Sequence, residues 1–407
     1  MPDTYRGIAP ESVLSEVEAL AAGLRGHALQ HVNSTRKGGG VAELLARLVP
    51  MFESLGIRTR WDVIDGNGDF YDVTKSMHNA LQGADVEFNY EDREIYLECL
   101  RENSKKLRLD ADVVVIHDAQ PAYLVDFCDF DRSRMVWRCH VDLAQPNASV
   151  WGFLSRAVSK YGLAIFHVPQ FAQPLPIPQV LIPPSIDPLS EKNRELEEEQ
   201  ITEVTERFGI DRARPVVVQV SRFDRFKDPL GVIRAFRLVR QNFDCQLVLA
   251  GGTADDDPES AQVLAEVHEG ADGDPDIFIL SLPPDADFEI NALQRAATVV
   301  MQKSTREGFG LTVTEAMWKG KPVVGGAAGG IPAQIIDRST GFLVHSAEGA
   351  AFRLRYLLSH PKHATRMGKR GREHVRRNFL ITRHLRDYLL VMHSVLRGCP
   401  ESPIWLL

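Results

Sequence analysis

Short runs of β-branched apolar residues recur through the chain, and most of them are followed by a segment whose apolar positions have helical spacing. Residues 113–116 (VVVI) and 215–220 (PVVVQV) are the clearest runs. Strands that alternate with helices are typical of a parallel sheet covered by helices. We therefore predict an α/β protein, with strands at residues 28–32, 113–116, 135–139, 215–220, 246–252, 277–280 and 298–301.

The length and texture of the chain divide it into two domains. Its 407 residues exceed the usual size of one hydrophobic core. A proline-rich stretch at residues 173–190 is followed by a charged helical segment, after which the strand pattern restarts. We predict Rossmann-like, doubly wound domains at residues 1–187 and 188–377. An amphipathic helix at 378–407 can pack on either half of the chain, and we expect it to pack back on the first domain.

Composition excludes several classes of function. A formal net charge of −8 argues against a general nucleic-acid binder. There is no apolar run of the roughly 18 to 20 residues that a membrane span needs, and no basic start followed by an apolar core, so we expect a cytoplasmic protein without a membrane partner. The five cysteines are widely spaced and form no C-x-x-C pair, which favours reduced thiols over disulfides or a metal site.

The segment STREGFGLTVTEAM, residues 304–317, places Glu307 and Glu315 eight positions apart. In a continuous helix they would be about 12 Å apart along the axis, whereas paired carboxyls of glycoside hydrolases lie roughly 5 to 10 Å apart. The spacing argues against a hydrolytic pair and suits two ends of one extended ligand. The flanking glycines predict that Glu307 lies in a loop and that a helix begins near Gly310 or Leu311, where free N–H groups can meet a phosphate.

Two further segments have the composition of phosphate-binding loops. Residues 34–45 (STRKGGGVAELL) place three glycines between a strand and a helix, where a ligand site and a flexible turn are equally good interpretations. Residues 220–229 (VSRFDRFKDP) follow a strand with three basic residues, which could clamp a diphosphate. Taken alone, that cluster is better explained as solvated charges paired with Asp224 and Asp228.

Histidines also stand where strands are expected to end. His117 and His140 each follow an apolar run, although a lone histidine is more often structural than catalytic. The acidic run Asp255-Asp256-Asp257 is better explained as a surface turn than as a metal site.

Together these segments resemble the retaining glycosyltransferases of family 4, which have the GT-B fold. The strongest match is the motif E-x7-E in the setting R-E-G-F-G-L-x-x-x-E-A-M, followed by W-K-G-K-P-V-V-G and by residues 329–332 (GGIP). Residues 65–83, 136–147 and 168–193 resemble the trehalose glycosyltransferring synthases more closely. The same three segments also fit the related trehalose phosphorylases.

The resemblance implies roles for the acidic and basic residues. In such enzymes the second glutamate of the motif binds the ribose of the donor and the first contacts the hydroxyls of the donor sugar, which implies these roles for Glu315 and Glu307. The basic pair neutralises the departing diphosphate, which implies that role for Arg222 and Lys227.

The resemblance also implies roles for backbone groups and for the first domain. The N–H groups of Phe309, Gly310 and Leu311 would help to bind the diphosphate. His140 would lie near the donor sugar. Gly39 and Gly40 would let the first domain close over phosphate and sugar. Asp142 and Lys75 are the expected acceptor-side residues.

The implied reaction joins the glucose of ADP-, UDP- or GDP-glucose to free glucose, with retention through a front-side process and without a protein nucleophile. No tightly bound cofactor is expected and no motif requires Mg²⁺; the implied assembly is a homodimer. The enzymatic alternatives are a trehalose phosphorylase or another family 4 hexosyltransferase. The alternative of another class is a catalytically silent regulator that binds sugar nucleotides.

Overall fold

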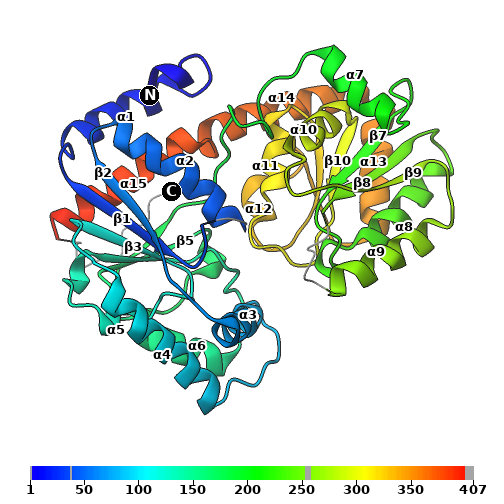
Figure 1. Cartoon of the computed structure of the whole chain (residues 1–407). Helices are drawn as coiled ribbons and strands as arrows, with labels where there is room; N and C mark the ends of the chain where they lie inside the picture. The colour runs from blue at the N-terminus through cyan, green and yellow to red at the C-terminus, as the bar shows by residue number, and fades with distance from the viewer. Residues whose placement is uncertain (1, 37–38, 253–257, 399–407) are drawn as a thin grey trace. The chain divides into compact units, whose positions relative to one another are not determined.

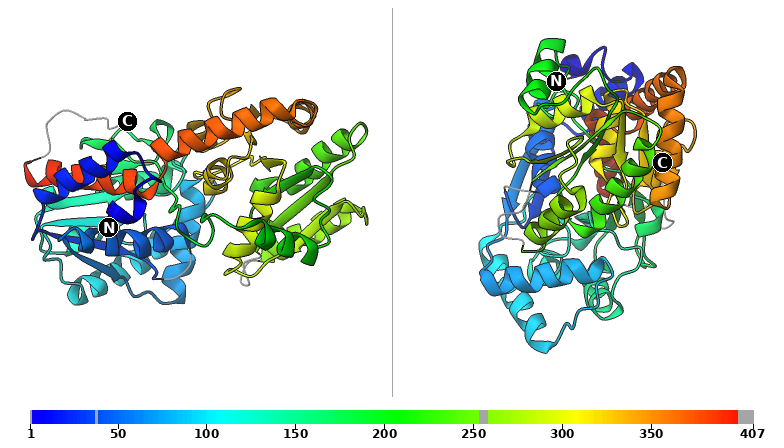
Figure 2. Two further views of the ribbon diagram at one scale, coloured as in Figure 1. Left: turned by 90° about the horizontal axis from the view of Figure 1, so that it is seen from above. Right: turned by 90° about the vertical axis from the view of Figure 1, so that its right-hand side faces the viewer.

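The computed structural model describes residues 2–36, 39–252 and 258–398, and it separates into two compact units. Unit 1 comprises the residues up to Pro184 together with the segment from Ile381 onward. Unit 2 comprises Ser185–Leu380. The sequence predicts domain boundaries after residues 187 and 377. In the structure the chain passes between the units after Pro184 and after Leu380, a few residues from each predicted boundary. Figures 1 and 2 show a sheet flanked by helices in each unit.

The sheet of unit 1 has six strands, all parallel, in the order β2-β1-β3-β4-β5-β6. Their bounds are β1 (Ala28–Asn33), β2 (Arg58–Val63), β3 (Val113–His117), β4 (Met135–Arg138), β5 (Leu163–Phe166) and β6 (Gln179–Leu181). Every residue of β3 and β4 is buried, as a central strand covered on both faces requires. The carboxyl ends of these two strands therefore bring His117 and His140 to one edge of the sheet.

Helices cover both faces of this sheet (Figure 1). One face carries α1 (Glu11–Ala22), α2 (Gly39–Ser54) and α15 (Ile381–Leu396), and the other carries α3 (Gly68–Leu81), α4 (Tyr90–Lys106), α5 (Leu124–Phe127) and α6 (Ala148–Val158). Asparagines fix two helix starts, because Asn67 caps α3 and Asn89 forms a capping box with Asp92 at α4. Short 3₁₀ turns lie at Pro2–Tyr5, Arg132–Arg134 and Pro169–Phe171.

The sheet of unit 2 also has six parallel strands, in the order β12-β11-β10-β7-β8-β9. Their bounds are β7 (Val216–Val220), β8 (Gln246–Gly251), β9 (Ile277–Ser281), β10 (Val299–Gln302), β11 (Val323–Gly326) and β12 (Phe342–Val344). Its helices are α7 (Glu198–Arg207), α8 (Pro229–Arg240), α9 (Pro258–Ala271), α10 (Asp287–Ala296), α11 (Leu311–Trp318), α12 (Ile331–Gln334), α13 (Ala347–Ser359) and α14 (Pro361–Asn378), with a 3₁₀ turn at Arg225–Lys227. Helices α8, α9 and α13 pack on one face through an apolar cluster.

The predicted fold class is confirmed, since both units are doubly wound parallel sheets. Each strand predicted from an apolar run is present within a residue or two of its expected bounds. Across the described residues, no helix is both long and apolar enough to cross a membrane. The described cysteines are free thiols: Cys99, Cys128, Cys139 and Cys245.

A buried ion pair anchors α15 in unit 1. Arg383 Nη1 lies 2.6 Å from Asp387 Oδ2, and the two side chains are only 6% and 8% exposed. Arg383 also donates through Nη2 to the carbonyl oxygens of Pro183 and Pro184, at 2.8 and 3.3 Å. Asp387 accepts a second bond from Arg386, so its carboxylate serves two guanidinium groups.

We expect Asp387→Ala to lower the free energy of unfolding of unit 1 by about 3 to 5 kcal/mol, because the Arg383 guanidinium would stay buried without its counter-charge. The control is Asp3→Ala, which removes an ion pair to Arg6 whose side chains are 81% and 56% exposed; it should leave stability unchanged within error. Urea unfolding followed by circular dichroism measures both. Similar losses in the two variants would contradict the prediction.

Candidate active site

Two loops at the carboxyl ends of neighbouring strands carry the predicted charged residues of unit 2. The basic loop, residues 221–228, follows β7, and the glutamate loop, residues 303–310, follows β10. Lys227 Nζ lies 2.9 and 2.8 Å from Glu307 Oε1 and Oε2. The two side chains are 16% and 10% exposed. The parallel sheet therefore brings together two residues that are 80 positions apart in the sequence.

The other basic residues of the basic loop have separate surroundings. The Arg222 side chain is 66% exposed, and its Nη2 lies 3.5 Å from Asp224 Oδ2. Arg225 forms a bidentate pair with Glu266 on α9, at 3.0 and 2.7 Å. The interpretation of the loop as solvated charges paired with Asp224 and Asp228 thus describes Arg222, whereas Arg225 pairs with Glu266. It does not describe Lys227, which is largely buried against a carboxylate from another loop.

Glycines allow the glutamate loop to take its course. Glu307 lies outside any helix and α11 begins at Leu311, which confirms both expectations for this segment. Gly310 precedes the helix with φ 84°, in the left-handed region. Gly329 has φ 52°, and a Cβ there would lie 1.5 Å from the carbonyl oxygen of Glu307. The lack of a side chain at Gly329 therefore lets the GGIP segment pack directly against the backbone of Glu307.

A buried amide fixes the turn that holds Phe309 and Gly310. Gln334 donates through Nε2 to the carbonyl oxygen of Phe309, and its Oε1 accepts a bond of 2.5 Å from Thr314 Oγ1 on α11. The N–H groups of Gly310 and Leu311 stand at the start of α11, where a helix leaves backbone donors without intrahelical partners. This end of α11 can therefore accept an anionic group.

Glu315 lies on α11 in a largely buried position, only 5% exposed. One turn further, Lys319 is also buried, and its Nζ donates to Gln294 Oε1 at 2.8 Å and to Asn193 Oδ1 at 3.1 Å. Burial lowers the pKa of Lys319 to about 7, against the opposing effect of the Glu315 carboxylate. Lys319 was not predicted from the sequence, although its spacing of four from Glu315 on a predicted helix was a usable signal.

In unit 1, His140 belongs to a run of four histidines in contact. His31 Nδ1 lies 3.0 Å from His117 Nε2, His117 Nδ1 lies 2.9 Å from His140 Nε2, and His140 Nδ1 lies 3.4 Å from His167 Nε2. Burial lowers the pKa of all four imidazoles well below the usual value. Of these, His140 is the half-buried one and the other three are buried. The sequence predicted the placing of His117 and His140 but missed His31 and His167.

The backbone of His140 also has a fixed hydrogen-bond partner. Its N–H donates to Asp118 Oδ1 at 2.6 Å, and Asp118 itself has φ 65°, in the left-handed region. Burial raises the pKa of Asp118 to about 7. With both ring nitrogens next to other histidines, the geometry suits a fixed neutral imidazole better than a group that exchanges protons.

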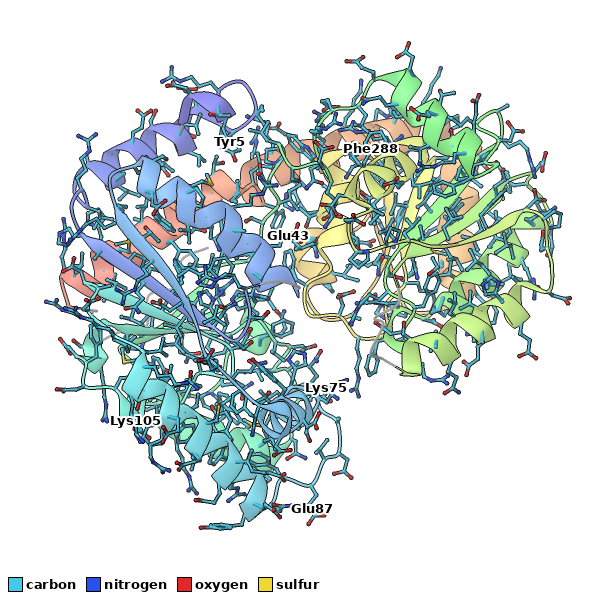
Figure 3. All side chains as sticks on the ribbon, viewed as in Figure 1. Tyr5, Glu43, Lys75, Glu87, Lys105 and Phe288 are labelled. Atoms are coloured by element: carbon cyan, nitrogen blue, oxygen red, sulfur yellow. The ribbon has the colours of Figure 1, made fainter. Side chains whose placement is uncertain are left out.

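The remaining predicted residues of unit 1 are Gly39, Gly40, Lys75 and Asp142. Gly39 and Gly40 begin α2, and a Cβ at Gly40 would meet no described atom within 4 Å. Lys75 is exposed on α3 (Figure 3), and Asp142 Oδ1 accepts a bond of 2.8 Å from the N–H of Ala144. Residues 37–38 of the glycine loop and the acidic run at 255–257 lie outside the described residues.

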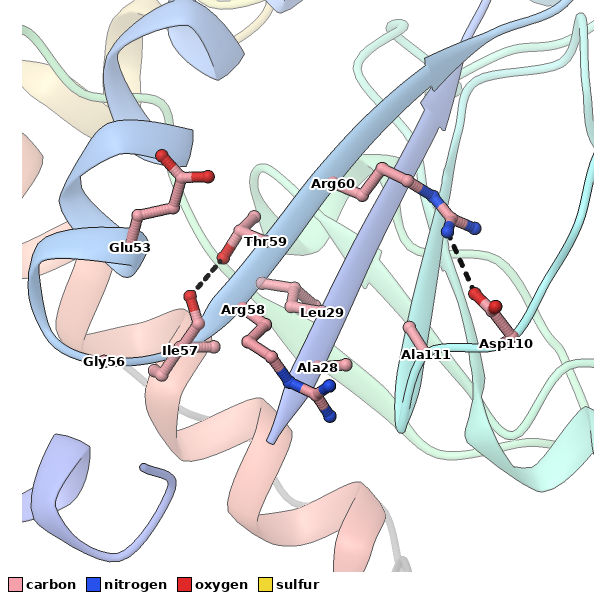
Figure 4. A pocket seen from close by; sticks show the side chains of 10 residues that line it. All are labelled: Ala28, Leu29, Glu53, Gly56, Ile57, Arg58, Thr59, Arg60, Asp110 and Ala111. Carbon is pink, nitrogen blue, oxygen red and sulfur yellow. Dashed lines mark hydrogen bonds and ion pairs between the residues drawn. The ribbon is translucent and has the colours of Figure 1, made fainter. Parts of the chain in front are cut away.

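A pocket of about 560 Å³ lies at the opposite end of the unit 1 sheet, beside the amino ends of β1 and β2 (Figure 4). Its lining includes Ala28, Arg58 and the Arg60–Asp110 ion pair. Ligands of parallel α/β sheets bind beyond the carboxyl ends of the strands, so we do not assign this pocket to the active site. No metal-binding group of three or more His, Cys, Asp or Glu side chains occurs within the described part of the chain.

Comparison with known proteins identifies both halves of the chain. Residues 31–173 match the family model "Trehalose synthase, N-terminal domain", and residues 200–374 match "Glycosyl transferases group 1". The trehalose synthase of Pyrococcus horikoshii is 46% identical over 399 residues, which cover 97% of this chain and 96% of the relative.

Solved structures that share the fold match most of the chain at low sequence identity. Sucrose-phosphate synthase from Thermosynechococcus elongatus has a TM-score of 0.67 at 19% identity, covering 91% of this chain and 98% of its own. Anabaena HepE, in complex with UDP and glucose, has a TM-score of 0.68 at 16% identity, covering 90% and 100%. The chain belongs to the trehalose synthase family, within family 4 of the GT-B glycosyltransferases.

Proposed function

We propose that this glycosyltransferase forms trehalose by transferring glucose from a nucleoside-diphosphate glucose to free glucose, with retention at the anomeric carbon. The observation that carries the proposal is the Lys227–Glu307 pair, a largely buried cation and carboxylate beside the start of α11. A donor with a diphosphate and a hydroxyl-rich sugar offers a partner for each of these charges. The trehalose synthase relative supports the product, and the UDP and glucose bound to HepE support the donor class.

Each charged residue of this site then has one task. Lys227 and Arg222 bind the diphosphate and offset its charge as it leaves, with help from the N–H groups at the start of α11. Glu307 accepts hydrogen bonds from the donor sugar, and Glu315 accepts them from the ribose. Lys319 holds the end of the helix that carries Glu315, through its bonds to Gln294 and Asn193.

The residues of unit 1 act on the sugar side of the donor. His140 would contact the donor sugar as a fixed neutral imidazole, held by His117 and His167. Gly39 and Gly40 would leave room for the donor at the start of α2.

Retention follows from a front-side reaction. The bond between the anomeric carbon and the diphosphate oxygen breaks, and that oxygen takes the proton of the acceptor hydroxyl on the same face. The acceptor oxygen then bonds to the anomeric carbon. Catalysis in this scheme rests on charge stabilisation and positioning rather than on a protein base.

The direct test incubates the purified protein with ADP-, UDP- or GDP-glucose, with and without glucose, and identifies the disaccharide and its linkage by NMR. We expect trehalose from at least one donor, only when glucose is present. A parallel incubation of trehalose with inorganic phosphate examines the phosphorylase alternative. Glucose 1-phosphate in that arm, with no trehalose from any donor, would replace the proposal by a phosphorylase, and no turnover in either arm would favour a regulator.

We predict that Lys227→Ala lowers kcat by about 10²- to 10³-fold, the usual effect of removing one charge-stabilising donor from an active site. The matched control is Arg225→Ala in the same loop, because Arg225 pairs with Glu266 instead. Its kcat should stay within about threefold of the wild type. Steady-state kinetics with the best donor measure both variants, and circular dichroism verifies their folding. Similar losses in both variants would remove Lys227 from the mechanism.

We predict that Glu315→Gln weakens donor binding specifically through the ribose. The wild type should bind the nucleoside diphosphate of its best donor about tenfold more tightly than the 2′,3′-dideoxy analogue, and the variant should bind the two almost equally. Isothermal titration calorimetry measures the affinity of both ligands for both proteins. An undiminished preference in the variant would assign the ribose contact to another residue.

A further inference from the structure

A buried glutamine connects the two loops of the active site. Gln219 is the polar residue within the apolar run of β7 and is 1% exposed. Its Oε1 accepts a bond of 3.2 Å from the N–H of Lys303, and its Nε2 donates to the carbonyl oxygen of Lys227 at 3.1 Å. A longer contact of 3.4 Å reaches Ser221 Oγ. The side chain thus bonds to the backbone of both loops, the glutamate loop through Lys303 and the basic loop through Lys227.

Other bonds join the same two loops. Lys303 Nζ pairs with Asp228, whose backbone is in the left-handed region at φ 47°. The N–H of Thr305 donates to the carbonyl oxygen of Phe226 at 2.7 Å. The path of the basic loop therefore depends on that of the glutamate loop on both sides of Lys227.

A second buried glutamine reaches the other member of the ion pair. Gln302, the last residue of β10, donates through Nε2 to Ser304 Oγ at 3.1 Å. Ser304 Oγ in turn donates to Glu307 Oε2 at 3.0 Å. Gln219 bonds to Lys227, Lys227 pairs with Glu307, and Glu307 is linked through Ser304 to the end of β10. The bond between Gln219 and the N–H of Lys303, directly after β10, completes a ring of contacts.

We propose that Gln219 is a positioning residue, which fixes the distance and direction of Lys227 relative to Glu307. This inference rests on the proposed function, in which that pair binds the donor. A primary amide suits the task because it donates and accepts at once, so one side chain can hold an N–H of one loop and a C=O of the other. An apolar side chain would fit a buried strand at least as well, so the buried amide is explained by the loops and not by the sheet.

The chain contains a matched control for this residue. Gln246, the first residue of the adjacent strand β8, is also 1% exposed. Its Oε1 accepts from the N–H of Asp211 at 3.0 Å and its Nε2 donates to the carbonyl oxygen of Asp211 at 2.7 Å. It therefore forms the same two kinds of bond at the amino end of the sheet, away from both loops.

The experiment compares Gln219→Met with Gln246→Met in thermal unfolding, donor kinetics and calorimetric binding of ADP, UDP and GDP. Both variants lose a buried amide, so we expect similar falls in melting temperature. Only Gln219→Met should weaken binding of the preferred nucleoside diphosphate, by about tenfold, and lower kcat/KM for the donor by about 10- to 100-fold, since small displacements of a positioning group are costly in rate. Equal effects of the two substitutions on binding would overturn the proposal.

A double-mutant cycle separates positioning from general destabilisation. If Gln219 acts through Lys227, then Gln219→Met in a Lys227→Ala background should cause no further loss of nucleoside diphosphate affinity. Gln246→Met in that background should change affinity as little as it does alone. Independent losses from Gln219→Met and Lys227→Ala would overturn the inference.

Binding also distinguishes this inference from the reaction itself. If the wild type forms no trehalose from any donor but binds one nucleoside diphosphate, the proposed reaction fails while the cycle still decides the role of Gln219. If none of the three nucleotides binds, both proposals fall.

Discussion

The ion pair between Lys227 and Glu307 is the interaction around which the polar contacts of the basic loop and the glutamate loop are arranged. Two charges this far removed from water are costly unless each has a partner and further hydrogen bonds. The partner is present at 2.8 to 2.9 Å, and Ser304 supplies a further bond to the carboxylate. A lysine held in this way has a defined direction before any ligand arrives. That order reduces the entropy that binding would otherwise have to overcome.

The sequence predicted the parts of this architecture that depend on local patterns. Apolar β-branched runs located the central strands, and glycines around Phe309 located the start of α11. It did not predict β2, where Arg58 and Arg60 alternate with half-buried residues on an edge strand of the sheet. Such a strand is stabilised by its pairing with β1 rather than by its own apolar content, and that pairing is not visible in a local window.

Within the site, the residues missed are those that act through tertiary contacts. Gln219 interrupts a run of valines, and in the sequence it is only a single polar residue within a predicted strand. His31 and His167 belong to the site only through their contacts with His117 and His140, which come from other strands or loops. The charged residues were easier to find, because the E-x7-E spacing and the basic loop are short-range patterns. The amides and imidazoles that hold such groups in place carry no comparable signature.

The discontinuity of unit 1 bears on how the chain folds during synthesis. Helix α15 contributes buried side chains to this unit, and the Tyr388 ring packs near the rings of His31 and Phe52. Residues 381–396 leave the ribosome only after all of unit 2 has been made. Domains generally fold as units, so unit 2 can complete its core while unit 1 still waits for its last helix. Until then, the apolar side chains that α15 covers in unit 1 stay exposed to solvent.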